Sequence, residues 1–482
     1  MDEAANGLVH LLLLLSTSTF HNSSQRPLAT VLPPKGLCQL GLSGCTTCAA
    51  IIRRGSAVSE NRYYLGSSPI VLKTDEDYSR LIQRLRQYLE VRNLSVLMGN
   101  GCSIPLGSPV IGDAGSLKGE FAKTKYQLTD SACQATALKT LEVLLPKAGK
   151  IGIEPLLTVL ANIQANEQLL GHQTTIGGKP VSASDARSLE QLLKKWLFLK
   201  CKEVSETEDS KLRFHEELLR RILLRSTTLP RAKIFTLNYD LLIERALDNL
   251  GVLYFDGFLG TINRTLRTES YHYDLYYPGE TTEGRVTRVD RVIHLYKLHG
   301  STNWRRHGSK GAEVVIRHGS PQDTEYGDVM IYPSPLKVTE MNGYPYSEMF
   351  RHLSAQITQQ QSVLLVIGYR FQDSHVNRLI YQALSIPSFV LVIVTPSLIE
   401  PAKGSEPGEE HEIWRLTQID SKRILVIVGG EKGADGNYVS GAGTLQDFST
   451  KLMPDISELN TEAKANEELA KILKKPSEPD AK

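Results

Sequence analysis

The sequence has few cysteines, little net charge and no internal repeat. Its six cysteines among 482 residues do not show the spacing of a disulfide scaffold, which indicates a reducing compartment. The formal net charge of +2 gives no reason to expect a polyanionic partner, so direct nucleic-acid binding is not indicated. With 41% hydrophobic and 22% charged residues, the composition is that of a globular protein, and we expect a cytoplasmic one.

The N-terminal region lacks the features of a membrane or secretion signal. The apolar run LVHLLLLL at residues 8–15 is too short to cross a bilayer, which takes about 20 residues. It follows Asp2 and Glu3, where a signal peptide would carry Lys or Arg. Because residues 1–70 show no sustained periodicity, we expect them to be a disordered or wrongly annotated extension. A charged tail is expected at 456–482.

The remaining chain, 71–455, is predicted to be one domain. From Thr74, apolar residues recur at spacings of three and four, which predicts a helix with Thr74 as its N-cap. Residues 114–230 are predicted to be a mostly helical insertion, with a polar loop at 171–185. Strands are predicted at 94–98, 232–238, 292–298, 362–368, 389–396 and 423–428. These runs are continuously apolar, which is typical of a parallel sheet covered by helices on both faces, so the fold class is α/β.

Small or polar residues end four of these strands. After the first come Gly99-Asn100-Gly101 and then Cys102-Ser103. Glycines there allow a sharp turn and close approach of a ligand, and a following helix would offer an anion site. A tight turn without a ligand would need the same residues.

The next two strand ends carry side chains suited to proton chemistry. Asn238 and Asp240 follow the second strand, although both could cap the next helix. His299 and Gly300 follow the third, where an imidazole can accept a proton near neutral pH, although a core histidine is the plainer interpretation. The fourth strand ends on Gly368-Tyr369. Because the carboxyl ends of parallel strands lie at one edge of a sheet, we expect all four loops to line one pocket.

In this order, the stretches GNGCS, TLNYD, KLHGS and IGYRF resemble the conserved motifs of the sirtuin (silent-information-regulator-like) superfamily. The likeness looks closest to its prokaryotic antiphage-defence branch, and it covers roughly residues 93–400. It implies a Rossmann-like NAD-binding fold with an inserted helical module at 114–230.

The resemblance also implies roles for individual residues. The catalytic residues would be Asn238 and His299. The residues that bind the dinucleotide would be Gly99, Asn100, Gly101, Cys102, Ser103, Asp240, Gly368 and Tyr369.

The sequence departs from protein-deacylating sirtuins in ways that matter for function. Those enzymes carry a four-cysteine zinc ribbon after the histidine, but no cysteine follows Cys201 here. We therefore expect no zinc ribbon and no bound metal. Two motif positions also differ, because Asn100 replaces the usual small residue and Leu237 the usual glutamine.

These departures favour plain cleavage of NAD+ over lysine deacylation. We expect an NAD+ glycohydrolase, a hydrolase that acts in antiviral defence and is gated by oligomerisation or a partner. The family resemblance suggests a homo-oligomer, with a HerA-type ATPase or a short Argonaute as the partner. A sensor that binds NAD or ADP-ribose without turnover remains open, as does an NAD-dependent deacylase or ADP-ribosyltransferase.

Overall fold

The computed structural model describes residues 59–109, 117–121, 123–148, 152–282, 285–308, 314–319, 329–331, 343–402, 404–434 and 436–455. The predictions made for 1–58 and 456–482 lie outside these ranges. Among the described residues, no helix is long and apolar enough to cross a membrane.

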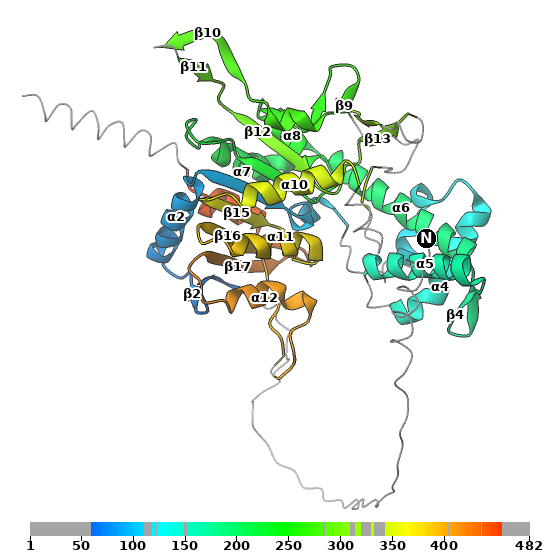
Figure 1. Cartoon of the computed structure of the whole chain (residues 1–482). Helices are drawn as coiled ribbons and strands as arrows, with labels where there is room; N and C mark the ends of the chain where they lie inside the picture. The colour runs from blue at the N-terminus through cyan, green and yellow to red at the C-terminus, as the bar shows by residue number, and fades with distance from the viewer. Residues whose placement is uncertain are drawn as a thin grey trace, which may run out of the picture. The chain divides into compact units, whose positions relative to one another are not determined.

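A largely parallel sheet forms the centre of the domain (Figure 1). Its parallel strands, in spatial order, are β17 (Ile424–Lys432), β16 (Phe389–Thr395), β15 (Ser362–Ile367), β3 (Asn93–Met98), β6 (Lys233–Thr236), β12 (Val292–Lys297) and β7 (Leu253–Phe255). From β3 the chain continues to β6 on one side, and it returns much later to β15 on the other. The point where the strand order reverses, between β3 and β15, is where open α/β sheets bind their ligands.

Helices cover both faces of this sheet, as predicted. One face packs against α10 (Tyr346–Ile357), α11 (Ser374–Leu384) and α12 (Glu412–Thr417). The other packs against α2 (Asp75–Leu89), α7 (Arg213–Leu223), α8 (Leu242–Asn249) and the single turn η7 (Phe448–Leu452). Each face has its own buried apolar cluster, which explains why the strands are apolar along their whole length rather than alternating.

Order begins earlier than predicted. The strands β1 (Ser59–Leu65) and β2 (Pro69–Val71) form an antiparallel edge beside β17, so the prediction that regular structure starts near Thr74 is wrong. The helix prediction itself is confirmed, because Thr74 caps α2 and its side chain accepts a hydrogen bond from Asp77 N at 3.2 Å. β1 (SENRYYL) begins with polar residues and β2 has only three residues, so neither shows the continuous apolar run by which the central strands were predicted.

The helical insertion has its own core. It contains α3 (Leu117–Phe121), α4 (Ser131–Ala148), α5 (Ile153–Leu170) and α6 (Ala183–Ser205), which bury side chains such as Phe121, Leu160 and Trp196. The predicted loop at 171–185 is instead a hairpin of β4 (Thr174–Ile176) and β5 (Lys179–Val181), followed by the start of α6. The last predicted helix of the insertion, α7, packs on the central sheet instead.

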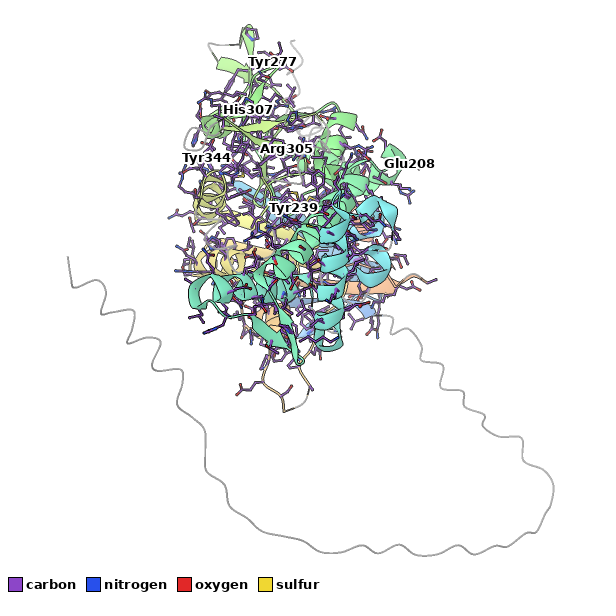
Figure 2. All side chains as sticks on the ribbon, turned by 90° about the vertical axis from the view of Figure 1, so that its right-hand side faces the viewer. Glu208, Tyr239, Tyr277, Arg305, His307 and Tyr344 are labelled. Atoms are coloured by element: carbon purple, nitrogen blue, oxygen red, sulfur yellow. The ribbon has the colours of Figure 1, made fainter. Side chains whose placement is uncertain are left out.

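Two smaller groups of strands lie outside the central sheet. One sheet contains β8 (Phe258–Leu259), β9 (Arg264–Leu266), β13 (Trp304–His307) and β14 (Val314–Arg317), and a hairpin contains β10 (Tyr276–Thr282) and β11 (Arg285–Arg288). In Figure 2, Tyr277 of this hairpin lies far from Tyr239, which is near the centre of the domain. The remaining short elements are η3 (Thr124–Tyr126), η4 (Asp209–Leu212), η5 (Thr268–His272), η6 (Glu409–His411), β18 (Tyr438–Ser440) and α13 (Leu445–Asp447).

Candidate active site

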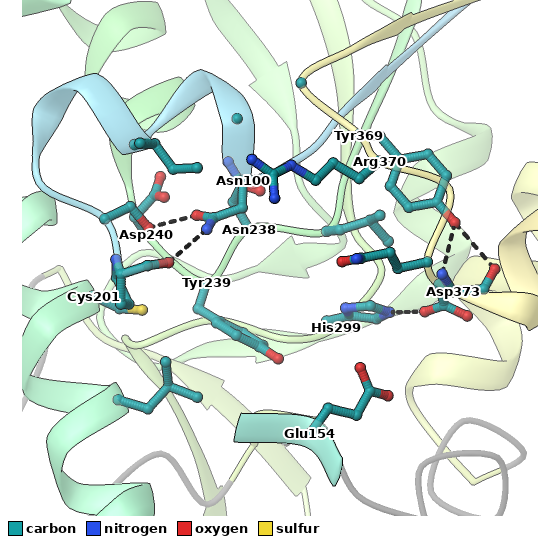
Figure 3. Close-up of a pocket in the computed structure, with 18 residues that line it drawn as sticks. Asn100, Glu154, Cys201, Asn238, Tyr239, Asp240, His299, Tyr369, Arg370 and Asp373 are labelled. Carbon is teal, nitrogen blue, oxygen red and sulfur yellow. Dashed lines mark hydrogen bonds and ion pairs between the residues drawn. The ribbon is translucent and has the colours of Figure 1, made fainter. Parts of the chain in front are cut away.

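The four predicted strand ends meet around one cavity. Met98 at the end of β3 pairs with Ile367 of β15 and Thr236 of β6, and Thr236 pairs with Lys297 of β12, so the four loops leave the sheet side by side. The cavity has about 990 Å³ of empty volume, which includes space open to solvent at its mouth. Its lining is drawn in Figure 3 and includes Asn100, Gly101, Asn238, Asp240, His299, Gly368 and Tyr369.

The glycines at the strand ends are explained by contact between two loops. Gly101 N donates to Gly368 O at 2.8 Å. A Cβ on Gly99 would lie 2.6 Å from Gly368 O, and a Cβ on Gly368 would lie 2.6 Å from Cys102 N. Gly368 also has φ +69°, which side chains rarely adopt. These glycines therefore let the two loops pack backbone to backbone.

The loop after β3 is built from 3₁₀ turns. Two short turns, η1 (Asn100–Cys102) and η2 (Ile104–Leu106), follow the strand directly. The anion site that a long helix would offer at this point is therefore absent from the described part of the loop, and the backbone of η1 faces the cavity instead.

Hydrogen bonds fix the side-chain nitrogen of Asn238 but not its side-chain oxygen. Its Nδ2 donates to Ser103 Oγ at 2.9 Å and to Gly99 O at 3.2 Å, which fixes the amide plane. Its Oδ1 is buried and has no hydrogen-bond partner among the described residues. A buried acceptor without a partner is costly, so this oxygen is suited to accept a hydrogen bond from a bound molecule or water.

Asp240 lies beside a buried ion pair. Its Oδ1 accepts from Leu242 N, at the first residue of α8, at 3.2 Å, but the N-cap position is Leu241, so the expected cap by Asp240 is not formed; Asp240 also lines the cavity. Burial raises the pKa of Asp240 above its usual value, while Lys297 and a hydrogen bond from Ser103 act in the opposite direction. Lys297 Nζ lies 2.9 Å from Glu244 Oε1, and both side chains are buried. This buried ion pair lies next to Asp240, on the side away from the cavity.

His299 is the imidazole of the cavity. Its Nε2 lies 3.2 Å from Asp373 Oδ2. Its ring lies 6.4 Å from the Tyr239 ring and 6.1 Å from the Phe350 ring, measured between centroids. Gly300 follows because the backbone there has φ +83° and a Cβ would lie only 2.0 Å from Val329 O. The strand thus ends on His-Gly for two reasons. The histidine lines the cavity, and only a residue without a Cβ can lie this close to the backbone at Val329.

The loops that carry Asn238 and His299 are fastened to each other. Thr302 N donates to Tyr239 O at 3.0 Å, and Thr302 Oγ1 lies 3.2 Å from the same oxygen. Thr302 is fully buried. The relative position of the amide and the imidazole is therefore set by the fold.

Two charged side chains of opposite sign also line the cavity. Arg370 follows Tyr369, and Figure 3 shows its side chain reaching across the cavity toward Asn100. Glu154 comes from the first turn of α5, and in Figure 3 it lies on another side, near His299. Arg370 and Glu154 thus bring opposite charges to different sides of the cavity.

Three predicted residues lie behind the lining rather than in it. Gly99, Cys102 and Ser103 are not among the residues that face the cavity. Cys102 Sγ lies 3.5 Å from Ile367 O, which accepts a hydrogen bond from it, and burial raises the pKa of this thiol, so it stays protonated. Ser103 is fully buried and acts through Asn238 and Asp240.

Other residues of the cavity were not predicted. Tyr239 and Arg370 belong to the motifs TLNYD and IGYRF, and Asp373 follows the second of them by two residues. Glu154, Leu197 and Cys201 come from the helical insertion, and nothing in their local sequence marks them. Within the described ranges, no group of three or more His, Cys, Asp or Glu residues is placed to hold a metal ion.

Comparison with known proteins gives a family match for part of the chain. Residues 232–413 match the family described as SIR2-like domain, a segment that includes Asn238, His299 and Gly368. No curated protein matches the chain significantly.

Solved structures with similarity to the chain include complexes of Sir2 homologues. One is a Sir2 homologue mutant with 2'-O-acetyl ADP ribose, with 13% identity over 70% of this chain and 94% of that one, and a TM-score of 0.32. Another is a Sir2 homologue with NAD, with 15% identity, 70% and 91% coverage, and a TM-score of 0.28.

Proposed function

We propose that this protein is an NAD+ glycohydrolase that cleaves NAD+ to nicotinamide and ADP-ribose. The observation that carries the proposal is that Asn238 and His299 line one cavity, and that the buried Oδ1 of Asn238 has no hydrogen-bond partner among the described residues. The match of residues 232–413 to the SIR2-like domain supports a substrate of the NAD class.

The charges of the cavity fit the charges of NAD+. The diphosphate would lie by the loop of Asn100 and Gly101, where the guanidinium of Arg370 offers positive charge. The nicotinamide ribose would lie by Asn238 and His299. The cationic pyridinium would then be on the side of Glu154, whose carboxylate has the opposite sign.

The reaction needs little acid catalysis. When the bond between C1' of the ribose and the pyridinium nitrogen breaks, its electron pair goes to that nitrogen and neutral nicotinamide leaves. The ribose passes through an oxocarbenium-like state, as in glycoside hydrolysis. A water oxygen then bonds to C1', oriented by Asn238 Oδ1, and its proton goes to His299. This step uses only groups that face the cavity.

The test is to incubate the purified chain with NAD+ and follow NAD+ loss and nicotinamide release by chromatography. We expect turnover by the wild type, and a loss of about 10²–10⁴-fold in the variants Asn238→Ala and His299→Ala. The matched controls Asn249→Ala and His307→Ala replace exposed residues of the same types and should keep wild-type rates. If the site variants cleave NAD+ as fast as the controls, the proposed site is wrong.

Two other outcomes would replace hydrolysis with another function. Tight NAD+ binding in calorimetry without product over long incubation would identify a sensor. Transfer of ADP-ribose or an acyl group, detected by mass spectrometry of protein acceptors, would identify a transferase or deacylase.

A role in antiphage defence follows from the resemblance of the motifs to that branch. Unchecked NAD+ cleavage would harm the cell that makes the enzyme, so we expect gating by oligomerisation or by a HerA-type ATPase or short Argonaute partner. Turnover per chain should therefore rise with protein concentration or on adding the partner. Constant turnover in both experiments would contradict the gating.

A further inference from the structure

Asp373 is the carboxylate that the structure places against the candidate catalytic imidazole. Its Oδ2 lies 3.2 Å from His299 Nε2, and both side chains are buried, with 8% and 7% of their side-chain surface exposed. At this distance, a carboxylate stabilises the imidazolium that forms when the ring accepts a proton. His299 therefore meets a fixed negative charge at one ring nitrogen, while Nδ1 lies on the other side of the ring.

The position of Asp373 is set by several bonds. Asp373 caps α11, where its Oδ1 accepts hydrogen bonds from His375 N at 3.1 Å and Val376 N at 3.4 Å. Its own N donates to the Tyr369 hydroxyl at 3.1 Å, and that hydroxyl donates to Asn377 Oδ1 at 2.7 Å. One carboxylate oxygen thus holds the helix and the other faces His299, so the orientation of the carboxylate is not free to change.

The other charged groups around His299 do not substitute for Asp373. Glu154, Asp240 and Arg370 line the same cavity from α5, the loop before α8 and the loop after β15. His375 lies beyond Phe350, whose ring is 4.9 Å from it. Among the described residues, the acidic side chain within ion-pair distance of His299 is that of Asp373.

We propose that Asp373 is the positioning residue for His299. Its carboxylate lies 3.2 Å from Nε2 as a fixed counter-charge to the ring, and the attacking water gives its proton to Nδ1. The imidazolium that forms is then paired with an Asp373 that stays ionised, so one proton moves from water to Nδ1 and no other bond changes. This inference rests on the proposed function for its catalytic part, but the contact with His299 can be tested without turnover.

The test compares three variants that separate the two duties of Asp373. Asp373→Asn keeps a helix-capping side chain of the same size but removes the charge, and Asp373→Ser keeps a cap that cannot reach His299. Asp373→Ala removes both duties. Asn and Ser are about as good as Asp at N-caps, so only the alanine variant should lose thermal stability.

The first readout is the titration of His299, followed by NMR of histidine-labelled protein and assigned by the signal lost in His299→Ala. In Asp373→Asn and Asp373→Ser we expect the midpoint to move to lower pH by about one unit or more, because the imidazolium loses its counter-charge. An unchanged midpoint in both variants would overturn the proposal, whether or not the protein cleaves NAD+.

The second readout is the pH profile of kcat/KM for NAD+ cleavage. The Asn and Ser variants should be slower than wild type, with the acid limb of the profile shifted to lower pH. Lower stability with an unshifted pH profile would mean that Asp373 acts only as a helix cap. If wild type shows no cleavage but the NMR midpoint moves, the proposed function fails and the positioning of His299 by Asp373 stands.

Discussion

At the scale of single residues, the chemistry depends on a few buried polar atoms. Asn238 and His299 could be predicted from sequence because each directly follows an apolar strand at the end where α/β proteins bind ligands. The contact between His299 and Asp373 could not, since the two residues are separated by 74 positions and Asp373 looks like an ordinary helix cap. The place of Glu154 in the cavity could not be predicted either, because only the packing of the insertion brings it there.

The contact between the two glycine-containing loops gives a prediction at this scale. Gly368→Ala places a Cβ 2.6 Å from Cys102 N at a backbone φ of +69°. A non-glycine residue held in such a conformation costs of the order of 1–3 kcal/mol. We therefore expect a lower urea midpoint of unfolding and weaker NAD+ binding, because the two loops must move apart.

The matched control for Gly368→Ala is Gly319→Ala. Nothing lies within 4 Å of a Cβ at Gly319, and its φ is not in the left-handed region. The control should unfold at the wild-type midpoint. Equal stability of the two variants would contradict the loop packing described above.

At the scale of elements, most long strands and helices were predicted, and the errors have physical causes. The strands β3, β12, β15, β16 and β17 are buried runs of apolar residues, so the sequence identifies them directly. The β4–β5 hairpin was missed because its strands are short and polar. Helix α7 was assigned to the insertion because no sequence signal tells which core a helix joins.

The start of α6 gives a prediction at the scale of elements. Ser182 caps this helix, accepting a hydrogen bond from Asp185 N at 3.1 Å, while Asp185 accepts from Ser182 N at 3.0 Å. Helix α6 also carries Leu197 and Cys201 to the cavity. Ser182→Ala should lower the free energy of unfolding by about 1 kcal/mol, measured in urea. Ser182→Asn, which keeps a good cap, should behave as wild type, and equal losses in both variants would show that the cap is not what stabilises the helix.

At the scale of the whole molecule, buried histidines make stability depend on pH. Burial lowers the pKa of His215 and of His294 to about 4 from an ordinary value of 6.5. Below pH 6.5 the unfolded chain binds protons that the folded chain does not, so the free energy of unfolding falls as the pH drops from about 6.5 toward 4. Each histidine contributes at most about 3 kcal/mol to this loss.

Urea unfolding at pH 7 and pH 5 measures this effect. We expect lower stability at pH 5, and a smaller difference between the two pH values in His215→Leu, which removes one of the buried histidines with a lowered pKa and lies on α7 outside the cavity. The variant His307→Ala replaces an exposed histidine and should keep the wild-type difference. Wild-type stability that does not change between pH 7 and pH 5 would contradict the buried, neutral state of these side chains.

One experiment tests the central claim, which is that the four strand-end loops bind NAD+ in one cavity. A crystal structure of the Asn238→Ala variant with NAD+ would show the dinucleotide in place, because that variant should bind but turn over slowly. We predict the nicotinamide ribose beside His299 and the diphosphate against the loops of Gly101 and Gly368. NAD+ bound elsewhere, or this cavity closed by packed side chains in the crystal, would contradict the account.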